Sequence, residues 1–182
     1  RVKGIVQIQV NEEIGITFSE ILRNALRNDP DIIVISEIRD EITAEIAVRA
    51  ALTGHLVIAT IHTNDSISTV TRLMDMGIPK YLILDALIGV IGQRLTGRKC
   101  FHCSGKGCKH CRNGYNGRIS INETLMINEE IKNILKSENS SYEYKNKLKK
   151  NQSDNFIDFE EDIKEKVRNN LIFEKDVIDF LI

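Results

Sequence analysis

Two short runs of aliphatic residues stand out in the first third of the chain, and polar residues follow both. The run Ile32–Ile35 is apolar without alternation, and so is most of 56–61. Such runs are typical of strands buried on both faces of a parallel sheet. Between them, residues 41–53 are apolar at helical spacing, with Asp40 as a candidate N-cap and Gly54 just beyond the end. The pattern predicts a βαβ unit and an α/β fold.

The neighbouring segments show the same two periodicities. Residues 6–10 alternate between apolar and polar, which is the period of a half-buried or edge strand. Residues 17–26 predict an amphipathic helix that opens with a capping box. Residues 81–95 are apolar at helical spacing and predict a long helix, and 118–127 predict a further strand.

The composition changes towards the C-terminus. Residues 137–155 are rich in Ser, Asn and Lys and predict weak helix broken by a linker, whereas 156–182 recover an apolar pattern. We expect three regions: a partial core over 1–97, a cysteine-rich insertion over 98–117, and a C-terminal strand with a helical appendage over 118–182.

Overall charge and composition narrow the class of protein. The chain has 182 residues, 42% of them hydrophobic, and a net charge of −1, so it can bury a core and carries no overall attraction to nucleic acid or membrane. No apolar run approaches the roughly 20 residues that cross a bilayer, and no signal-peptide pattern opens the chain, so we expect a cytoplasmic protein. Because Arg1 already lies next to a predicted strand, we expect the chain to start inside a longer protein.

Polar side chains follow both predicted strands of the βαβ unit. Glu37 comes after the first strand and His62 after the second. In open α/β sheets ligands bind beyond the carboxyl ends of the strands, so we expect these two side chains at one site. There a carboxylate can polarise a water for attack on a phosphoryl group, and an imidazole can donate to a phosphate oxygen. The alternatives are a solvated charge cluster and a histidine held by a structural hydrogen bond.

All four cysteines lie in one short segment. Cys100 and Cys103 form one C-x-x-C pair, Cys108 and Cys111 form a second, and four residues separate the pairs. Four thiolates at this spacing suit tetrahedral Zn²⁺, and such closed sites are structural because no coordination position stays open for a water. The alternative is a set of buried or redox-active cysteines. His102 and His110 could act as substitute ligands, but four cysteines make them unnecessary.

The segment around the cysteines is strongly basic. Residues 94–118 contain seven Lys and Arg residues and no Asp or Glu. Part of this charge offsets the net negative charge of a zinc tetrathiolate, and the remainder suits an acidic partner surface or anionic headgroups. A solubilising surface is the alternative. Two aromatic residues are too few for single-stranded nucleic acid, so we expect no direct nucleic-acid binding.

Three longer motifs carry a family resemblance. The chain resembles the secretion ATPases of type II secretion and type IV pilus assembly at LRNDPDIIVISEIRD (26–40), TAEIAVRAALTGHLVIATIHTND (43–65) and TRLMDMGIP (71–79). The resemblance implies a partial RecA-like P-loop ATPase core, with a parallel sheet flanked by helices, and a small zinc-binding and helical C-terminal appendage. It also implies a homo-oligomer, usually a hexamer, that drives pilin or pseudopilin assembly through an inner-membrane platform protein at the inner face of the cell membrane.

The resemblance assigns roles to single residues. Glu37 matches the Walker B glutamate that readies the attacking water, and Arg39 and Asp40 complete that motif. His55 and His62 match the His box, although His55 precedes its strand and a structural hydrogen bond is the alternative we favour there. ATP and Mg²⁺ are the implied cofactors of the intact protein.

Two features of the chain bear on which member of the family it resembles. The cysteines resemble the tetracysteine motif of assembly-type members, although the gap between the two pairs is short here, and this resemblance favours assembly or secretion over retraction. No G-x-x-x-x-G-K-[ST] loop occurs among the 182 residues, and that loop holds the β- and γ-phosphates. We therefore expect the C-terminal part of the motor, inactive by itself. A competence pseudopilus ATPase for DNA uptake and a truncated, non-hydrolysing, zinc-stabilised interaction module are the alternatives.

Overall fold

Helices and strands alternate over residues 18–75 in the manner of an α/β protein, as the sequence predicts. The computed structural model describes residues 3–137, 140–150 and 155–180. None of the helices within these ranges has the length and hydropathy needed to cross a bilayer. The elements, in chain order, are η1 (Glu12–Ile14), α1 (Phe18–Leu26), β1 (Ile32–Ile35), α2 (Glu41–Leu52), β2 (Leu56–Ala59), α3 (Ser66–Asp75), α4 (Lys80–Ala86), β3 (Gly89–Lys99), β4 (Tyr115–Met126), α5 (Glu129–Ser137), α6 (Ser141–Lys150), β5 (Phe156–Ile157), α7 (Phe159–Arg168), η2 (Glu174–Asp176) and η3 (Ile178–Phe180).

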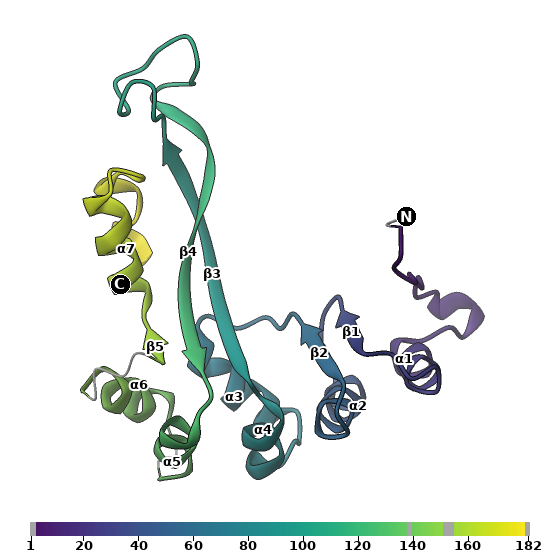
Figure 1. The fold of residues 1–182 in the computed structure, drawn as a ribbon. Helices are drawn as coiled ribbons and strands as arrows, with labels where there is room; N and C mark the ends of the chain where they lie inside the picture. The colour runs from purple at the N-terminus through teal and green to yellow at the C-terminus, as the bar shows by residue number, and fades with distance from the viewer. Residues whose placement is uncertain (1–2, 138–139, 151–154, 181–182) are drawn as a thin grey trace. The chain divides into compact units, whose positions relative to one another are not determined.

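The chain divides into two compact units. Unit 1 comprises residues 1–62 and 69–87, and unit 2 comprises residues 63–68 and 88–182. Unit 1 holds the two parallel strands β1 and β2 with the helices α1, α2 and α4, whereas unit 2 holds the antiparallel strands β3, β4 and β5 with α5, α6 and α7 (Figure 1).

Unit 1 contains the predicted βαβ unit. β1 and β2 pair in parallel, with Ile33 opposite Val57 and Ile35 opposite Ala59. α2 connects them, and its N-cap is Asp40, whose carboxylate accepts a hydrogen bond from the Thr43 backbone N–H at 2.8 Å. This N-cap satisfies one of the amide groups that the first turn of a helix leaves without a partner. The predicted strand, helix and cap are confirmed.

The prediction that both strands are buried on both faces is wrong. In β1, Ile33 and Ile35 are buried, whereas Ile32 and Val34 are 57% and 72% exposed, and Ile58 of β2 is 52% exposed. The buried residues of β1 lie at alternate positions, and α2 packs against β2. Among the described residues no element covers the exposed face, so a run without alternation here forms a strand with only one buried face.

The predicted strand over 6–10 is also absent. These residues have no regular structure and are mostly exposed, and the nearest pairing is an isolated bridge between Asn11 and Ile16. A segment with this alternation forms a strand only where a neighbouring strand hydrogen-bonds its backbone N–H and C=O groups. No strand of the described ranges pairs with residues 6–10. The predicted helix that follows does form, with Thr17 accepting a hydrogen bond from the Glu20 N–H at 3.3 Å.

The long helix predicted over 81–95 is wrong. α4 ends at Ala86, Leu87 has extended backbone angles, and β3 begins at Gly89. The apolar residues of this stretch recur at helical spacing, but Gly89 and Gly92 and the β-branched residues Val90 and Ile91 disfavour a helix, and the β-branched residues suit a strand. Pairing with β4 along almost the whole of β3 decides the outcome.

Unit 2 is built on a long antiparallel hairpin. β3 and β4 pair from Gly89 opposite Met126 to Lys99 opposite Tyr115, and the segment with the four cysteines connects them at the hairpin tip (Figure 1). The strand predicted over 118–127 is therefore confirmed as part of β4. The short strand β5 pairs with the other edge of β4.

Helices from the C-terminal region pack on this hairpin, as the predicted helical appendage requires. α7 contacts β4, and a buried apolar cluster forms between them from Ile121, Phe159, Ile163, Ile172 and Val177. α6 forms within the segment rich in Ser, Asn and Lys, which confirms helix there. The linker part of that prediction falls partly on 138–139 and 151–154, which lie outside the described residues.

Candidate functional site

The loops that follow β1 and β2 are joined by two hydrogen bonds. The Ile38 backbone N–H donates to the Thr60 carbonyl oxygen at 2.9 Å, and the Thr60 hydroxyl donates to the Ser36 carbonyl oxygen. These bonds extend the pairing of the two segments beyond the ends of the strands. They help to fix the positions of Glu37, which lies between the bonded residues Ser36 and Ile38, and of His62, two residues after Thr60.

Glu37, Arg39 and His62 come together at this edge of the sheet. Nε2 of His62 lies 3.2 Å from Oε2 of Glu37, and the Arg39 guanidinium forms an ion pair with Oε1 of Glu37. The Glu37 side chain is 19% exposed, whereas that of His62 is 88% exposed. The arrangement therefore places a half-buried carboxylate beneath an imidazole that faces solvent.

The charge state of Glu37 follows from its neighbours. The ion pair with Arg39 lowers the pKa of the Glu37 carboxyl, burial acts in the opposite direction, and the hydrogen bond with His62 lowers the pKa further. The net effect is a pKa below the usual range, so the carboxylate is ionised at neutral pH. An ionised carboxylate has about four acceptor positions, and these two partners leave room for a hydrogen bond from a water.

The other two residues of the predicted nucleotide site make local contacts. The Asp40 carboxylate is occupied by the N-cap of α2, where it also accepts from the Thr43 hydroxyl at 3.0 Å. Nδ1 of His55 donates to the Ala50 carbonyl oxygen at 3.0 Å. A strand of four residues spans about 13 Å, so His55 and His62 lie at opposite ends of β2. The structure does not bring His55 to Glu37, which favours the structural hydrogen bond for this histidine.

The four cysteine sulfurs form one cluster at the tip of the hairpin, and all lie within 4.8 Å of one another. Cys100 and Cys108 are 3.9 Å apart, Cys103 and Cys111 are 3.7 Å apart, and so are Cys108 and Cys111. A tetrahedral site with Zn–S bonds of about 2.3 Å requires sulfur separations of about 3.8 Å. The residues present therefore fit a zinc ion.

Two thiols of this cluster, Cys103 and Cys108, have pKa values shifted in opposite directions. Burial raises the pKa of Cys103, but a hydrogen bond from the Gly107 N–H and contacts with the other three thiols outweigh it and lower this pKa to about 7. At Cys108, a backbone hydrogen bond at His110 lowers the pKa, but burial and the neighbouring thiols raise it to about 12. One thiolate thus forms readily and another only with difficulty, because adjacent negative charges repel. A divalent cation would allow all four to ionise.

Sequence reasoning missed a buried carboxylate in unit 2. Glu123 on β4 is fully buried, and its Oε1 accepts a hydrogen bond from the Ser66 backbone N–H at 2.8 Å. A signal for it does exist in the sequence. Glu123 lies between Ile121 and Leu125 at the inward-facing positions of a predicted strand, where an acidic residue requires partners.

Comparison with known proteins identifies the family of this chain. The family model for type II/IV secretion system proteins matches residues 1–178. Type II secretion system protein HxcR of Pseudomonas aeruginosa is 51% identical over 72% of this chain and 30% of its own length. The type IV pilus assembly ATPase PilB of Thermus thermophilus is 44% identical over 79% of this chain and 19% of its own length. The chain thus spans less than a third of each of these relatives.

Solved structures confirm the predicted fold class. The ATPase DotB of Legionella pneumophila matches with a TM-score of 0.70 and 26% identity, over 91% of this chain and 42% of that one. The pilus retraction motor PilT with bound ADP matches with a TM-score of 0.69 and 29% identity, over 91% of this chain and 44% of that one. This chain belongs to the type II/IV secretion system protein family, the family of the secretion and pilus assembly ATPases.

Proposed function

We propose that this chain is the C-terminal part of an ATPase that powers pilin or pseudopilin assembly, and that Glu37 and His62 act at its hydrolysis site. The observation that carries the proposal is the 3.2 Å contact between these side chains at the carboxyl ends of two parallel strands. Membership of the family supports it, since two relatives are named as a type II secretion protein and a type IV pilus assembly ATPase. The phosphate-binding loop would come from residues outside these 182.

Each residue of the site has a distinct role in this proposal. Glu37 is ionised, so it accepts a hydrogen bond from the attacking water and orients that water towards the γ-phosphate. Its low pKa makes it a positioning group rather than a strong base. Arg39 holds the carboxylate by the ion pair. His62 faces solvent and donates either to Glu37 or to a γ-phosphate oxygen, so its partner reports whether nucleotide is present. Bound ATP and Mg²⁺ supply the phosphoryl group and the compensating charge.

The cysteine cluster has a structural role in this proposal. Cys100, Cys103, Cys108 and Cys111 would hold Zn²⁺ with four thiolates, which fills its coordination sphere and leaves no position for a reacting water. The ion would stabilise the tip of the β3–β4 hairpin, a segment with few apolar residues to bury.

The working assembly belongs to the same proposal. The intact motor would be a homo-oligomer, a hexamer, at the cytoplasmic face of the inner membrane, in contact with a platform protein. The names of the relatives support a role in secretion or pilus assembly. The basic segment 94–118 is the surface of this chain that best suits an acidic partner.

Hydrolysis of ATP by the full-length protein tests the proposal. Glu37→Gln keeps the size of the side chain and removes its charge, and it should lower kcat at least about 100-fold while ATP still binds. Glu45→Gln is a matched control, because Glu45 also pairs with an arginine, Arg49, but lies on α2 away from the strand ends. Wild-type kcat in Glu37→Gln, or full-length protein without ATPase activity, would overturn the proposal.

A further inference from the structure

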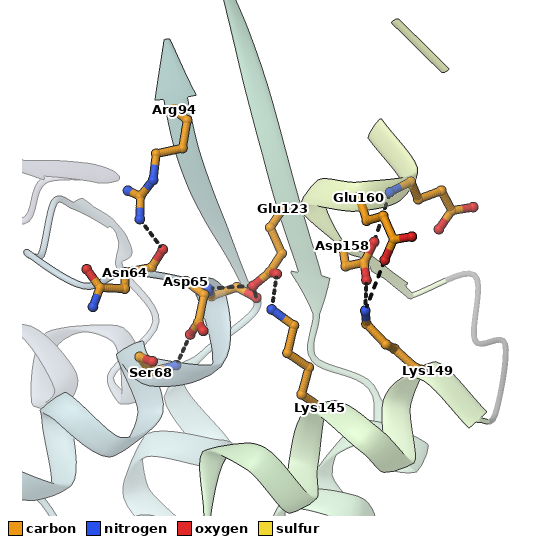
Figure 2. A network of polar contacts seen from close by, with 11 residues as sticks. Asn64, Asp65, Ser68, Arg94, Glu123, Lys145, Lys149, Asp158 and Glu160 are labelled. Atoms are coloured by element: carbon orange, nitrogen blue, oxygen red, sulfur yellow. Dashed lines mark hydrogen bonds and ion pairs between the residues drawn. The ribbon is translucent and has the colours of Figure 1, made fainter. Parts of the chain in front are cut away.

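Residues 63–68 follow His62 directly and belong to unit 2. Side chains of β3 and β4 hold this segment by hydrogen bonds, and Lys145 of α6 forms an ion pair with the β4 residue Glu123 (Figure 2). The segment also contains the start of α3, which Asp65 caps by accepting a hydrogen bond from the Ser68 N–H at 2.7 Å. One peptide bond therefore connects an anchored segment to the histidine of the proposed site.

Glu123 makes the central contacts with this segment. Its Oε1 accepts from the Ser66 N–H at 2.8 Å and from the Ser66 hydroxyl at 2.7 Å, and its Oε2 pairs with Nζ of Lys145 at 3.1 Å. Ser66 is the first residue of α3, where backbone N–H groups lack helical partners and a negative charge is favoured. A fully buried carboxylate is stable only with such partners, so this side chain and the segment fix each other's positions.

Two residues of β3 complete the contacts. Nη2 of Arg94 donates to the Asn64 carbonyl oxygen at 2.7 Å, and its guanidinium lies 5.6 Å from the centre of the Phe159 ring. Gly92 lies close against the segment, because a Cβ there would meet the Ser66 nitrogen at 3.4 Å and the Phe159 ring at 3.2 Å. The backbone next to His62 is thus held at both Asn64 and Ser66.

We propose that Glu123 is a positioning residue for His62, which it directs through Ser66 and the segment 63–68. This inference rests on the proposed function of His62. Glu123 contacts no reacting group itself. Its effect on hydrolysis arises because the hydrogen bonds at Asn64 and Ser66 limit the backbone conformations open to the adjacent His62, and with them the conformations of its ring.

A double-mutant cycle on ATP hydrolysis by the full-length protein tests this. Glu123→Ala removes both hydrogen bonds that Ser66 donates to Glu123 and should lower kcat about tenfold with little change in the KM for ATP. If Glu123 acts through His62, the same substitution should have no further effect in a His62→Ala background. If Glu123 only stabilises the fold, the losses of kcat caused by Glu123→Ala and His62→Ala would multiply in the double variant.

Asp158 provides a matched control. Like Glu123, it is a buried carboxylate that accepts a hydrogen bond at the start of a helix, from the Glu161 N–H at 2.9 Å, and pairs with a lysine of α6, Lys149 (Figure 2). These contacts join α6 and α7, and neither involves residues 63–68. Asp158→Asn should therefore keep kcat within about twofold of wild type, because these bonds do not hold the backbone next to His62.

The outcomes separate this inference from the proposed function. Wild-type kcat in His62→Ala would overturn the proposed role of His62 and this inference with it. Two results would overturn the positioning role alone, both with a lowered kcat in His62→Ala. The first is a wild-type kcat in Glu123→Ala, and the second is a double variant in which the losses of kcat from the two substitutions multiply. Should Glu123→Ala fail to fold, Arg94→Ala removes a single hydrogen bond to the same segment, and the same cycle applies.

Discussion

His62 Nε2 and Glu37 Oε2 lie 3.2 Å apart although the two residues are 25 positions apart in the sequence. The contact exists because β1 and β2 are parallel neighbours, so the residues that follow them leave the sheet at one edge. The bond between the Thr60 hydroxyl and the Ser36 carbonyl oxygen maintains the register beyond the strands. The acid and the imidazole therefore belong to one site.

Arg39 sets the pH range in which Glu37 is charged. The ion pair with Arg39 contributes most to the lowered pKa of the Glu37 carboxyl, so Arg39→Ala should raise that pKa. Glu37 would then take up a proton at a higher pH, and the acid limb of kcat/KM for ATP should move to higher pH. Arg49→Ala, which breaks the pair with Glu45, should leave the limb in place. An unchanged limb in Arg39→Ala, or one shifted to lower pH, would contradict the prediction.

Asp40 should contribute to stability through its hydrogen bonds. Because its carboxylate caps α2, Asp40→Ala should lower the free energy of unfolding by about 1 kcal/mol, as loss of an N-cap does. Asp40→Asn keeps an oxygen acceptor and should retain most of that stability. Urea unfolding followed by circular dichroism measures both. Equal losses would show that the charge of Asp40, rather than its capping bonds, is what matters.

Metal analysis tests the cysteine cluster. The protein purified under reducing conditions should contain one zinc ion per chain, and chelation should lower its melting temperature, since a structural zinc ion is worth about 10–16 kcal/mol in small peptides. Cys103→Ser should lose zinc, whereas His110→Ala should retain it because four sulfurs already complete the site. Metal-free wild-type protein would rule the site out.

Two glycines beside the cysteines should differ in their tolerance of a side chain. Both have positive φ angles, of 86° at Gly105 and 95° at Gly107, so alanine strains the backbone at either position by about 1–2 kcal/mol. A Cβ at Gly105 would also lie 2.4 Å from the Phe173 ring, whereas none of the surrounding atoms lies within 4 Å at Gly107. Gly105→Ala should therefore lower the melting temperature more than Gly107→Ala, and the reverse order would contradict this packing.

The hydrophobic pattern was enough to predict the fold near the site. The apolar run Ile32–Ile35, the cap at Asp40 and the spacing of the next helix define a βαβ unit, and parallel topology then brings Glu37 and His62 together. Burial could not be predicted in the same way. The exposure of Val34 depends on which elements cover the sheet, and the residues around Val34 do not indicate which elements those are.

Long-range contacts account for what the sequence left undetermined. Residues 81–95 satisfy the spacing of a helix, but the pairing of Gly89 with Met126 makes their second half a strand. Glu123 and Ser66 are 57 positions apart, and neither neighbourhood identifies the other as a partner. An acidic residue at an inward-facing position signals that some partner exists, but only the folded chain shows which one.

ATP hydrolysis by the full-length protein, compared for Glu37→Gln, His62→Ala and the double variant, tests most directly whether these two residues act as one unit on the γ-phosphate. If they do, the double variant should hydrolyse ATP no more slowly than Glu37→Gln alone, because the first substitution already disables the shared site. If the losses of kcat from the two substitutions multiply instead, Glu37 and His62 act independently, and the 3.2 Å contact between them plays no part in catalysis.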